Sequence, residues 1–315
     1  MPLGRLKCAL LLLLSSAHLA LAQKTTTSQP SQPAIPEATE LPGRLPAAAS
    51  HNSDSVALRQ HLRQAAALQA KYKDSDALAQ YQQVLKLDPQ HYESLWRAAG
   101  LSVSIGDRYS DETRKKAYFD AARQYADRAL ALQPTGGESN YAMALALFSE
   151  ASLLSARDRL RIFKELRPRV LLATEQRPDL PEAWQLLGRW YYRVAHYNVL
   201  EKTFSRIFLG GYPQGATSRK AVDALEHARL LDPTRIQYYY DLARVYKYEG
   251  LRHRALALLE AAVKLPTYTS EDLAVNRLCQ QLLEPLQRAE SRNARLREKL
   301  RLRAVGDRKE KKIKN

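Results

Sequence analysis

Apolar residues recur at the spacing of amphipathic helices from Val56 to about Leu286, and the apolar segments end again and again just before a proline. Proline stops a helix because it lacks an N–H group to donate and pushes the preceding residue out of the helical conformation. Successive prolines of this kind are 45, 44, 55 and 33 residues apart, which indicates an array of helical hairpins with insertions. They are Pro89, Pro134, Pro178, Pro233 and Pro266.

Three of these segments carry residues at which the paired helices of a tetratricopeptide repeat touch. The motif Y-x-x-L-A-x-x-Y begins at Tyr239, W-x-x-L-G-x-x-Y begins at Trp184, and A-x-x-x-Y begins at Ala77. After the Trp184 motif, Phe204 lies on an extra helix, and the closing helix of that pair comes only at Ala221. The pattern predicts an all-α fold over residues 56–286, a tetratricopeptide-like helical-hairpin solenoid with insertions, because small residues at the contact positions let helices approach closely.

Four further stretches are distinctive: S-L-W-R-A-A at 94–99, L-G-R-W-Y-Y-R-V-A at 187–195, F-L-G-G-Y-P at 208–213 and L-P-T-Y-T-S-E-D at 265–272. Together they resemble the family called regulator of microtubule dynamics, whose members are tetratricopeptide-type proteins with irregular insertions. The resemblance implies a superhelical all-α scaffold and, for animal members, association with microtubules. With the N-terminal segment described next, it implies a secreted bacterial member of that family.

The N-terminus has the parts of a secretory signal peptide. A basic start precedes an apolar run from Cys8 to Ala22, which is short for a membrane span and ends in the pattern A-L-A that a signal peptidase cleaves. The sequence therefore predicts a signal peptide at 1–22 and export, either to the periplasm or as a secreted protein. An organellar transit peptide is the rival interpretation, because no acidic residue precedes Glu37.

Two segments of biased composition flank the predicted solenoid. Residues 23–55 contain five prolines among Ser, Thr, Gln and Ala, so we expect a Pro/Ser/Thr-rich linker. Residues 287–315 form a basic C-terminal tail, in which we expect 288–303 to continue the last helix and 309–314 to be disordered.

The tail carries much of the formal net charge of +16, because residues 286–315 hold 12 Lys or Arg against four Asp or Glu. Peripheral contact with an anionic membrane is one interpretation of this charge, and a solvated end of the solenoid is the other. No aromatic residue is interleaved with the basic ones, so we expect no specific nucleic-acid binding.

The search for chemistry is negative. No two histidines have the spacing around a glutamate that a helical zinc site needs, and the glycine pairs at 136–137 and 210–211 lack the Lys-Ser/Thr of a phosphate loop. Cys279 lies on an apolar helix, where we expect a buried, unreactive thiol. We therefore expect a protein that is not an enzyme and uses no cofactor or metal.

The array offers a groove instead, since first helices of stacked pairs line the concave surface of such a solenoid. Their outward stripes near Trp184 and Tyr239 carry tyrosines alternating with arginine or lysine, which suits a peptide with acidic side chains or a free C-terminus. Packing of these side chains against one another or against the insertions is the alternative. The candidate peptide-binding residues are Gln185, Arg189, Tyr192, Arg193, Tyr240, Arg244, Lys247 and Tyr248.

From these patterns we expect an exported, non-enzymatic scaffold that binds a protein or peptide through a Tyr/Arg-lined concave groove. A structural subunit of a cell-envelope assembly is one alternative. A microtubule-associated regulator, implied by the family resemblance alone, is the other. The oligomeric state and the identity of the partner stay open at this point.

Overall fold

The computed structural model describes the backbone of residues 47–314 and the side chains of residues 54–303. The predicted signal peptide and residues 23–46 of the predicted linker lie outside the described residues. The described part is helical and has no strand. Its helices are α1 (Ala47–Gln69), α2 (Asp74–Leu87), α3 (Tyr92–Asp107), α4 (Glu112–Leu132), α5 (Gly137–Glu150), α6 (Ala156–Gln176), α7 (Pro181–Ala195), α8 (Val199–Phe208), α9 (Ser218–Leu231), α10 (Ile236–Tyr248), α11 (Arg252–Ala262) and α12 (Ser270–Lys314).

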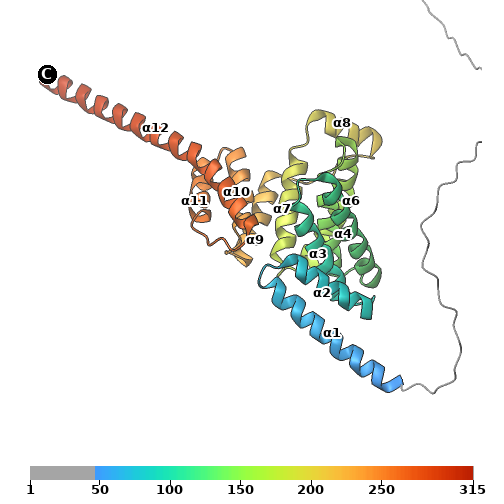
Figure 1. The fold of residues 1–315 in the computed structure, drawn as a ribbon. Helices are drawn as coiled ribbons and strands as arrows, with labels where there is room; N and C mark the ends of the chain where they lie inside the picture. Colours follow the sequence, from blue (N-terminus) through green and yellow to red (C-terminus); the bar gives the residue numbers. More distant parts are fainter. Residues whose placement is uncertain (1–46, 315) are drawn as a thin grey trace, which may run out of the picture. The chain divides into compact units, whose positions relative to one another are not determined.

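The helices pack in pairs that follow one another along the chain (Figure 1). The pairs are α1 with α2, α3 with α4, α5 with α6, α7 with α9, and α10 with α11, and α12 packs on the last pair. Each pair also contacts the next, so the buried apolar faces form a core along the array. This arrangement confirms the predicted helical-hairpin solenoid.

The prolines mark the helix ends as predicted. The helices α2, α4, α6 and α9 each end two residues before a proline. The residue between the helix end and the proline still donates its backbone N–H to the carbonyl four residues earlier. The N–H of Asp88 donates to the carbonyl of Val84 at 2.8 Å, and that of Asp232 donates to the carbonyl of Ala228 at 3.1 Å. The helix therefore stops where the missing donor and the steric clash of proline would fall.

The pair α7–α9 is interrupted by an inserted helix, as the displaced motif predicts. Gly188 of α7 lies against Leu225 of α9, and this close approach joins the two helices across the insertion. Trp190 is fully buried and donates its indole N–H to the carbonyl of Phe163 at 2.9 Å, which fixes α7 on α6. The extra helix α8 then packs on α6 outside the succession of pairs.

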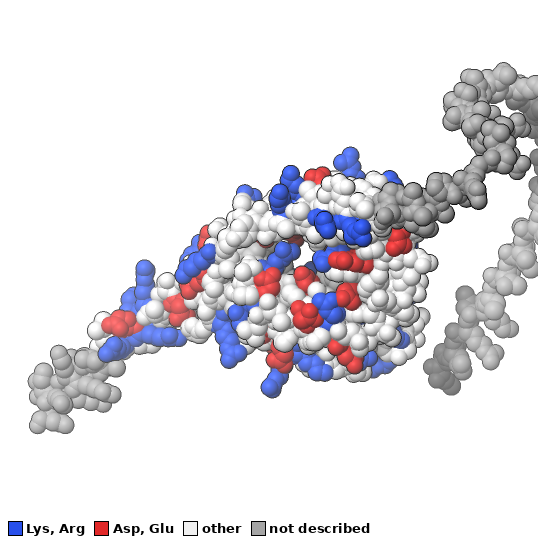
Figure 2. Space-filling view, turned by 90° about the horizontal axis from the view of Figure 1, so that it is seen from below, with Lys and Arg blue, Asp and Glu red and all other residues white. Residues whose placement is uncertain are grey.

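Two predicted boundaries need correction. Helix α1 begins at Ala47, inside the segment 23–55 assigned to the linker, because three alanines in a row favour helix once the last proline has passed. Helix α12 continues through 288–303 as expected, but it runs on to Lys314, so the prediction of disorder at 309–314 is wrong. Figure 2 shows basic side chains along the projecting part of this helix.

Cys279 lies in the core formed by α10, α11 and α12 and is fully buried, in agreement with the sequence-based expectation. Burial raises the pKa of its thiol to about 12, so the thiolate is suppressed at neutral pH. Within the described range, no helix carries an apolar stretch that is long enough to cross a bilayer.

Candidate peptide-binding surface

The first helices of the pairs surround a hollow of about 520 Å³, which we call the inner channel. Trp96 of α3, Tyr141 of α5, Gln185 of α7 and Tyr238 of α10 all line it, and Glu271 at the start of α12 lies on its wall. The side chains of one helix from each pair therefore converge on one cavity. This is the concave surface that the repeat pattern predicts.

Two loops from opposite ends of the array meet beside the channel. Tyr72 in the turn between α1 and α2 stacks on Tyr268 in the loop before α12, with ring centroids 5.9 Å apart and planes 9° apart. Tyr72 has a φ of 58°, in the left-handed region that residues other than glycine rarely adopt. Tyr72 lines the channel and Tyr268 is next in sequence to the lining residue Thr269, so their contact closes the array on itself.

Charges of both signs line the inner channel. Arg108 pairs with Asp74 across α2 and α3, and Arg97 pairs with Glu93 at 3.3 Å. Loss of solvation raises the pKa of Asp107, against the opposing effect of Lys115. Acidic and basic side chains also gather together in the middle of the face shown in Figure 2. In the described part of the chain no group of three or more His, Cys, Asp or Glu is placed to hold a metal ion.

A second hollow, of about 440 Å³, opens between α5–α6 and α7–α10, and we call it the arginine pocket. Four arginines line it, and Asp241 is the carboxylate among its lining residues. Arg189 lines both this pocket and the inner channel, so the two hollows adjoin at that side chain. The arginines are Arg159, Arg189, Arg193 and Arg244.

Two of the four arginines have an aromatic ring as a neighbour and no carboxylate partner. The guanidinium of Arg189 lies 4.4 Å above the ring of Phe148, and that of Arg244 lies 5.5 Å from the ring of Tyr240. Among the described residues neither has a carboxylate within salt-bridge distance. Aromatic rings orient a guanidinium without neutralising it, so both side chains remain able to fork onto an anion.

Arg193, which also lines the arginine pocket, is already paired with a carboxylate. It forms an ion pair with Glu201 of α8, whose second hydrogen bond to the guanidinium is 3.4 Å long, and it lies 5.0 Å from the ring of Tyr197. Burial alone would raise the pKa of Glu201, but hydrogen bonds from Arg193 and from the backbone of Asn198 lower it. The Arg193 charge is therefore used to hold the inserted helix.

The other candidates divide between the pocket and its surroundings. Gln185 donates to Asp241 at 2.7 Å, and Tyr192 lines the arginine pocket. Tyr248 meets Tyr192 edge to face with centroids 5.8 Å apart, which places it next to the pocket. The ring of Tyr240 lies against the guanidinium of Arg244. Lys247 is exposed and lines neither hollow.

Sequence reasoning missed Asp241, Phe148 and Phe163. Asp241 is only 6% exposed and accepts hydrogen bonds from Gln185 and from Gln237, at 3.1 Å for the latter. A lone acidic residue inside the apolar stretch that begins at Ile236 was a usable signal for it. The two phenylalanines belong to a neighbouring helix pair. No spacing in the sequence links them to the arginines whose guanidinium groups lie over their rings.

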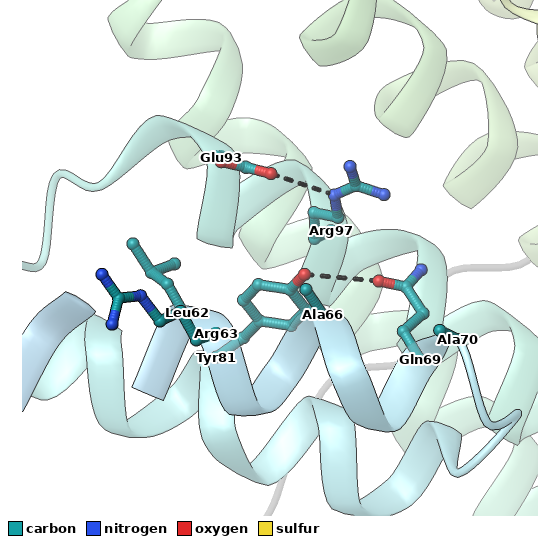
Figure 3. A pocket seen from close by; sticks show the side chains of 8 residues that line it. All are labelled: Leu62, Arg63, Ala66, Gln69, Ala70, Tyr81, Glu93 and Arg97. Atoms are coloured by element: carbon teal, nitrogen blue, oxygen red, sulfur yellow. Dashed lines mark hydrogen bonds and ion pairs between the residues drawn. The ribbon is translucent and has the colours of Figure 1, made fainter. Parts of the chain in front are cut away.

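A third hollow, of about 530 Å³, lies between α1, α2 and α3 (Figure 3). Tyr81 stands at its base and donates to Gln69 at 3.3 Å, and Arg97 faces it beside Glu93. Arg97 also lines the inner channel. The inner channel therefore adjoins each of the other two hollows, one at Arg97 and the other at Arg189.

Comparisons with known proteins give the family. The sequence profile described as "Regulator of microtubule dynamics protein 1-3" matches residues 61–287. Regulator of microtubule dynamics protein 3 of Mus musculus is 31% identical over 197 residues, which are 60% of this chain and 40% of that protein. Regulator of microtubule dynamics protein 2 of Homo sapiens is 26% identical over 202 residues, 62% of this chain and 48% of that protein. This chain thus matches less than half the length of each relative.

Among solved structures, a thermophilic tetratricopeptide-repeat protein of Thermus thermophilus aligns with a TM-score of 0.53. The alignment covers 72% of this chain and 98% of that one at 18% identity, a likeness that concerns the fold alone. The fold is thus that of tetratricopeptide repeats. Because the family profile spans most of its length, this chain belongs to the regulator of microtubule dynamics family.

Proposed function

We propose that this chain is a non-enzymatic scaffold that binds an extended segment of a partner protein along its inner surface. The three adjoining hollows are the observation that supports this most directly. An extended peptide covers about 3.3 Å per residue, so hollows that adjoin one another suit a segment of chain better than a compact small molecule.

The arginine pocket gives the proposal its chemistry. Arg189 and Arg244 offer two unpaired guanidinium groups to an acidic side chain or a free C-terminal carboxylate. Tyr192 and Tyr248 add stiff aromatic contact area beside them. The buried carboxylate of Asp241 is already bonded to two glutamine side chains, which limits its repulsion of an anionic ligand.

We also propose that the chain acts outside the cytosol, since the apolar run at 8–22 predicts a signal peptide. Its relatives are named for regulating microtubule dynamics, and export would separate this chain from tubulin. N-terminal sequencing of the mature protein tests this. A chain that begins near Gln23 supports export. A retained N-terminus, together with co-sedimentation with microtubules, would favour the cytoskeletal role.

A peptide array with free C-termini tests the proposed groove. The native chain is compared with Arg189→Glu/Arg244→Glu, and Arg301→Glu/Arg303→Glu on the exposed part of α12 serves as a control with the same change of charge. We expect acidic peptides to bind the native chain and the control, and to bind the pocket variant at least about ten-fold more weakly, since hydrogen bonds to charged groups contribute about 1.5–3 kcal/mol each.

Equal binding by the native chain and the pocket variant would remove the arginine pocket from the proposal. Loss of binding only in the α12 variant would show that the basic tail attracts acidic peptides non-specifically. A chain that copurifies with one partner at fixed stoichiometry and exchanges no peptide would favour the envelope-subunit alternative. Circular dichroism of each variant separates these outcomes from misfolding.

A further inference from the structure

Helix α8 exposes a dense group of large apolar side chains. Val199, Leu200, Ile207 and Phe208 are 78%, 80%, 65% and 68% exposed, although the helix is only ten residues long. Large apolar residues that are scattered singly on a surface need no explanation, but four on one short helix form a patch. Figure 1 shows α8 beyond one end of the helices α6 and α7.

The inserted helix α8 is held in place by contacts at its N-terminus and along one side. The exposed apolar side chains therefore belong to an ordered helix. Asn198 and Glu201 form a reciprocal capping box at its N-terminus, with hydrogen bonds of 2.8 and 2.9 Å. Arg193 pairs with Glu201, and Phe204 packs on the core from the inner face. These contacts fix the inner side of α8 and leave its apolar side outward.

Basic side chains surround the patch. Lys202 and Arg206 are on α8 itself, Arg157 lies 5.6 Å from the ring of Phe204, and Lys164 donates to the carbonyl of Leu209. Among the described residues none of these four forms an ion pair with a carboxylate. The rim of the patch is therefore positively charged, while the acidic residue of the helix, Glu201, is neutralised by Arg193.

From this geometry we propose that α8 docks on an anionic lipid bilayer. An apolar helix face with lysine and arginine at its edge enters the boundary between headgroups and acyl chains, and its affinity grows with buried apolar area and with anionic lipid. A second copy of the chain fits less well, because two basic rims would repel each other. The proposal concerns a surface separate from the inner channel and does not depend on peptide binding.

Co-sedimentation of the full chain with vesicles tests this. The probes are vesicles of phosphatidylcholine alone and of phosphatidylcholine mixed with phosphatidylserine. We expect the native chain to bind the mixed vesicles, and Leu200→Ser/Phe208→Ser to reduce the partition coefficient about ten-fold or more. Leu230→Ser/Leu231→Ser on α9, which removes two other exposed leucines, should bind like the native chain.

Two further measurements identify the mode of binding. Lys202→Gln/Arg206→Gln should weaken binding to the mixed vesicles, with little effect on the weak binding to phosphatidylcholine alone. In a Phe208→Trp variant, brominated lipids should quench additional fluorescence relative to the native chain, because the new side chain would enter the acyl region.

Three results would overturn the proposal. In the first, the native chain does not bind the mixed vesicles. In the second, Leu200→Ser/Phe208→Ser binds them as well as the native chain does, with binding lost instead in Arg301→Glu/Arg303→Glu. In the third, light scattering shows a native dimer that the α8 variant converts to a monomer, which would make the patch a contact between copies.

Discussion

Gly188 lies where α7 and α9 approach each other closely. A Cβ atom there would lie 2.6 Å from Cγ of Leu225 and 3.1 Å from the carbonyl oxygen of Ala221. Leu225 is buried and cannot move aside freely. Gly100, in α3, is also helical, but a Cβ atom there would have no neighbour within 4 Å. These two glycines therefore separate the effect of packing from that of helix propensity.

We expect Gly188→Ala to lower the free energy of unfolding by about 1 kcal/mol, because overpacking of about 1–3 kcal/mol exceeds the gain in helix propensity. Gly100→Ala should raise it by about 0.5–1 kcal/mol, since only the propensity changes. Urea denaturation of the two variants and the native chain measures both values. Stabilisation of equal size in both variants would mean that the α7–α9 contact is looser than described.

At the residue scale, the candidate site was predictable only in part. The stripe that contains Arg189, Tyr192 and Arg244 follows from helical periodicity, because residues three and four apart share a face. The same rule placed Arg193 with them, although its partner Glu201 lies beyond the end of the helix. Helical periodicity predicts the face on which a side chain lies. It does not predict which residue of the following helix that side chain contacts.

The docking of the inserted helix α8 depends on the ion pair between Arg193 and Glu201. Arg193 and Glu201 are both largely shielded from solvent, and their ion pair links α7 to α8. We expect Arg193→Ala to weaken the docking of α8 by about 1–2 kcal/mol, because the carboxylate of Glu201 would lose its charged partner. Hydrogen exchange of the amides from Val199 to Phe208 should then be about ten-fold faster.

Arg244→Ala is the matched control for this element, because Arg244 lines the same pocket but contacts no residue of α8. Its amide exchange in α8 should equal that of the native chain. If both variants loosened α8 equally, the helix would depend on the pocket as a whole and not on the ion pair.

The whole molecule should lose stability at alkaline pH. Burial raises the pKa of Cys279 from 9.0 to about 12, and it raises the pKa of the buried Tyr81, Tyr197, Tyr238 and Tyr246 above 10.0. A group with a raised folded-state pKa stabilises the fold fully below its unfolded pKa, and this contribution is lost as the pH rises through the folded value. The window therefore begins near pH 9 with the thiol and continues above pH 10 with the phenols.

We expect the free energy of unfolding to fall above about pH 9, by about 1.4 kcal/mol per pH unit for each group that ionises only on unfolding. Urea denaturation at several pH values measures the slope. In Cys279→Ala the fall between pH 9 and pH 10 should disappear and the steeper fall above pH 10 should remain. A free energy that stays constant from pH 8 to pH 11 would contradict the burial of these groups.

By itself the sequence determined the helical-hairpin fold, the helix ends that prolines mark, the extra helix behind the Trp184 motif and the burial of Cys279. These features are local, because helical periodicity and proline act within a few residues along the chain. It placed the start of α1 and the end of α12 incorrectly, since composition alone does not show how far good helix formers continue a helix.

The tertiary structure alone decided which charges are free and where the hollows lie. Asp241 is bonded to glutamines from two helices, Phe148 supports Arg189 from another pair, and Tyr72 meets Tyr268 across the array. The contacts of Asp241 with Gln185, of Phe148 with Arg189 and of Tyr72 with Tyr268 join residues far apart in the sequence. They therefore depend on how the pairs stack and not on the pattern within any one helix. The candidate peptide-binding surface therefore depends on how the helix pairs pack on one another.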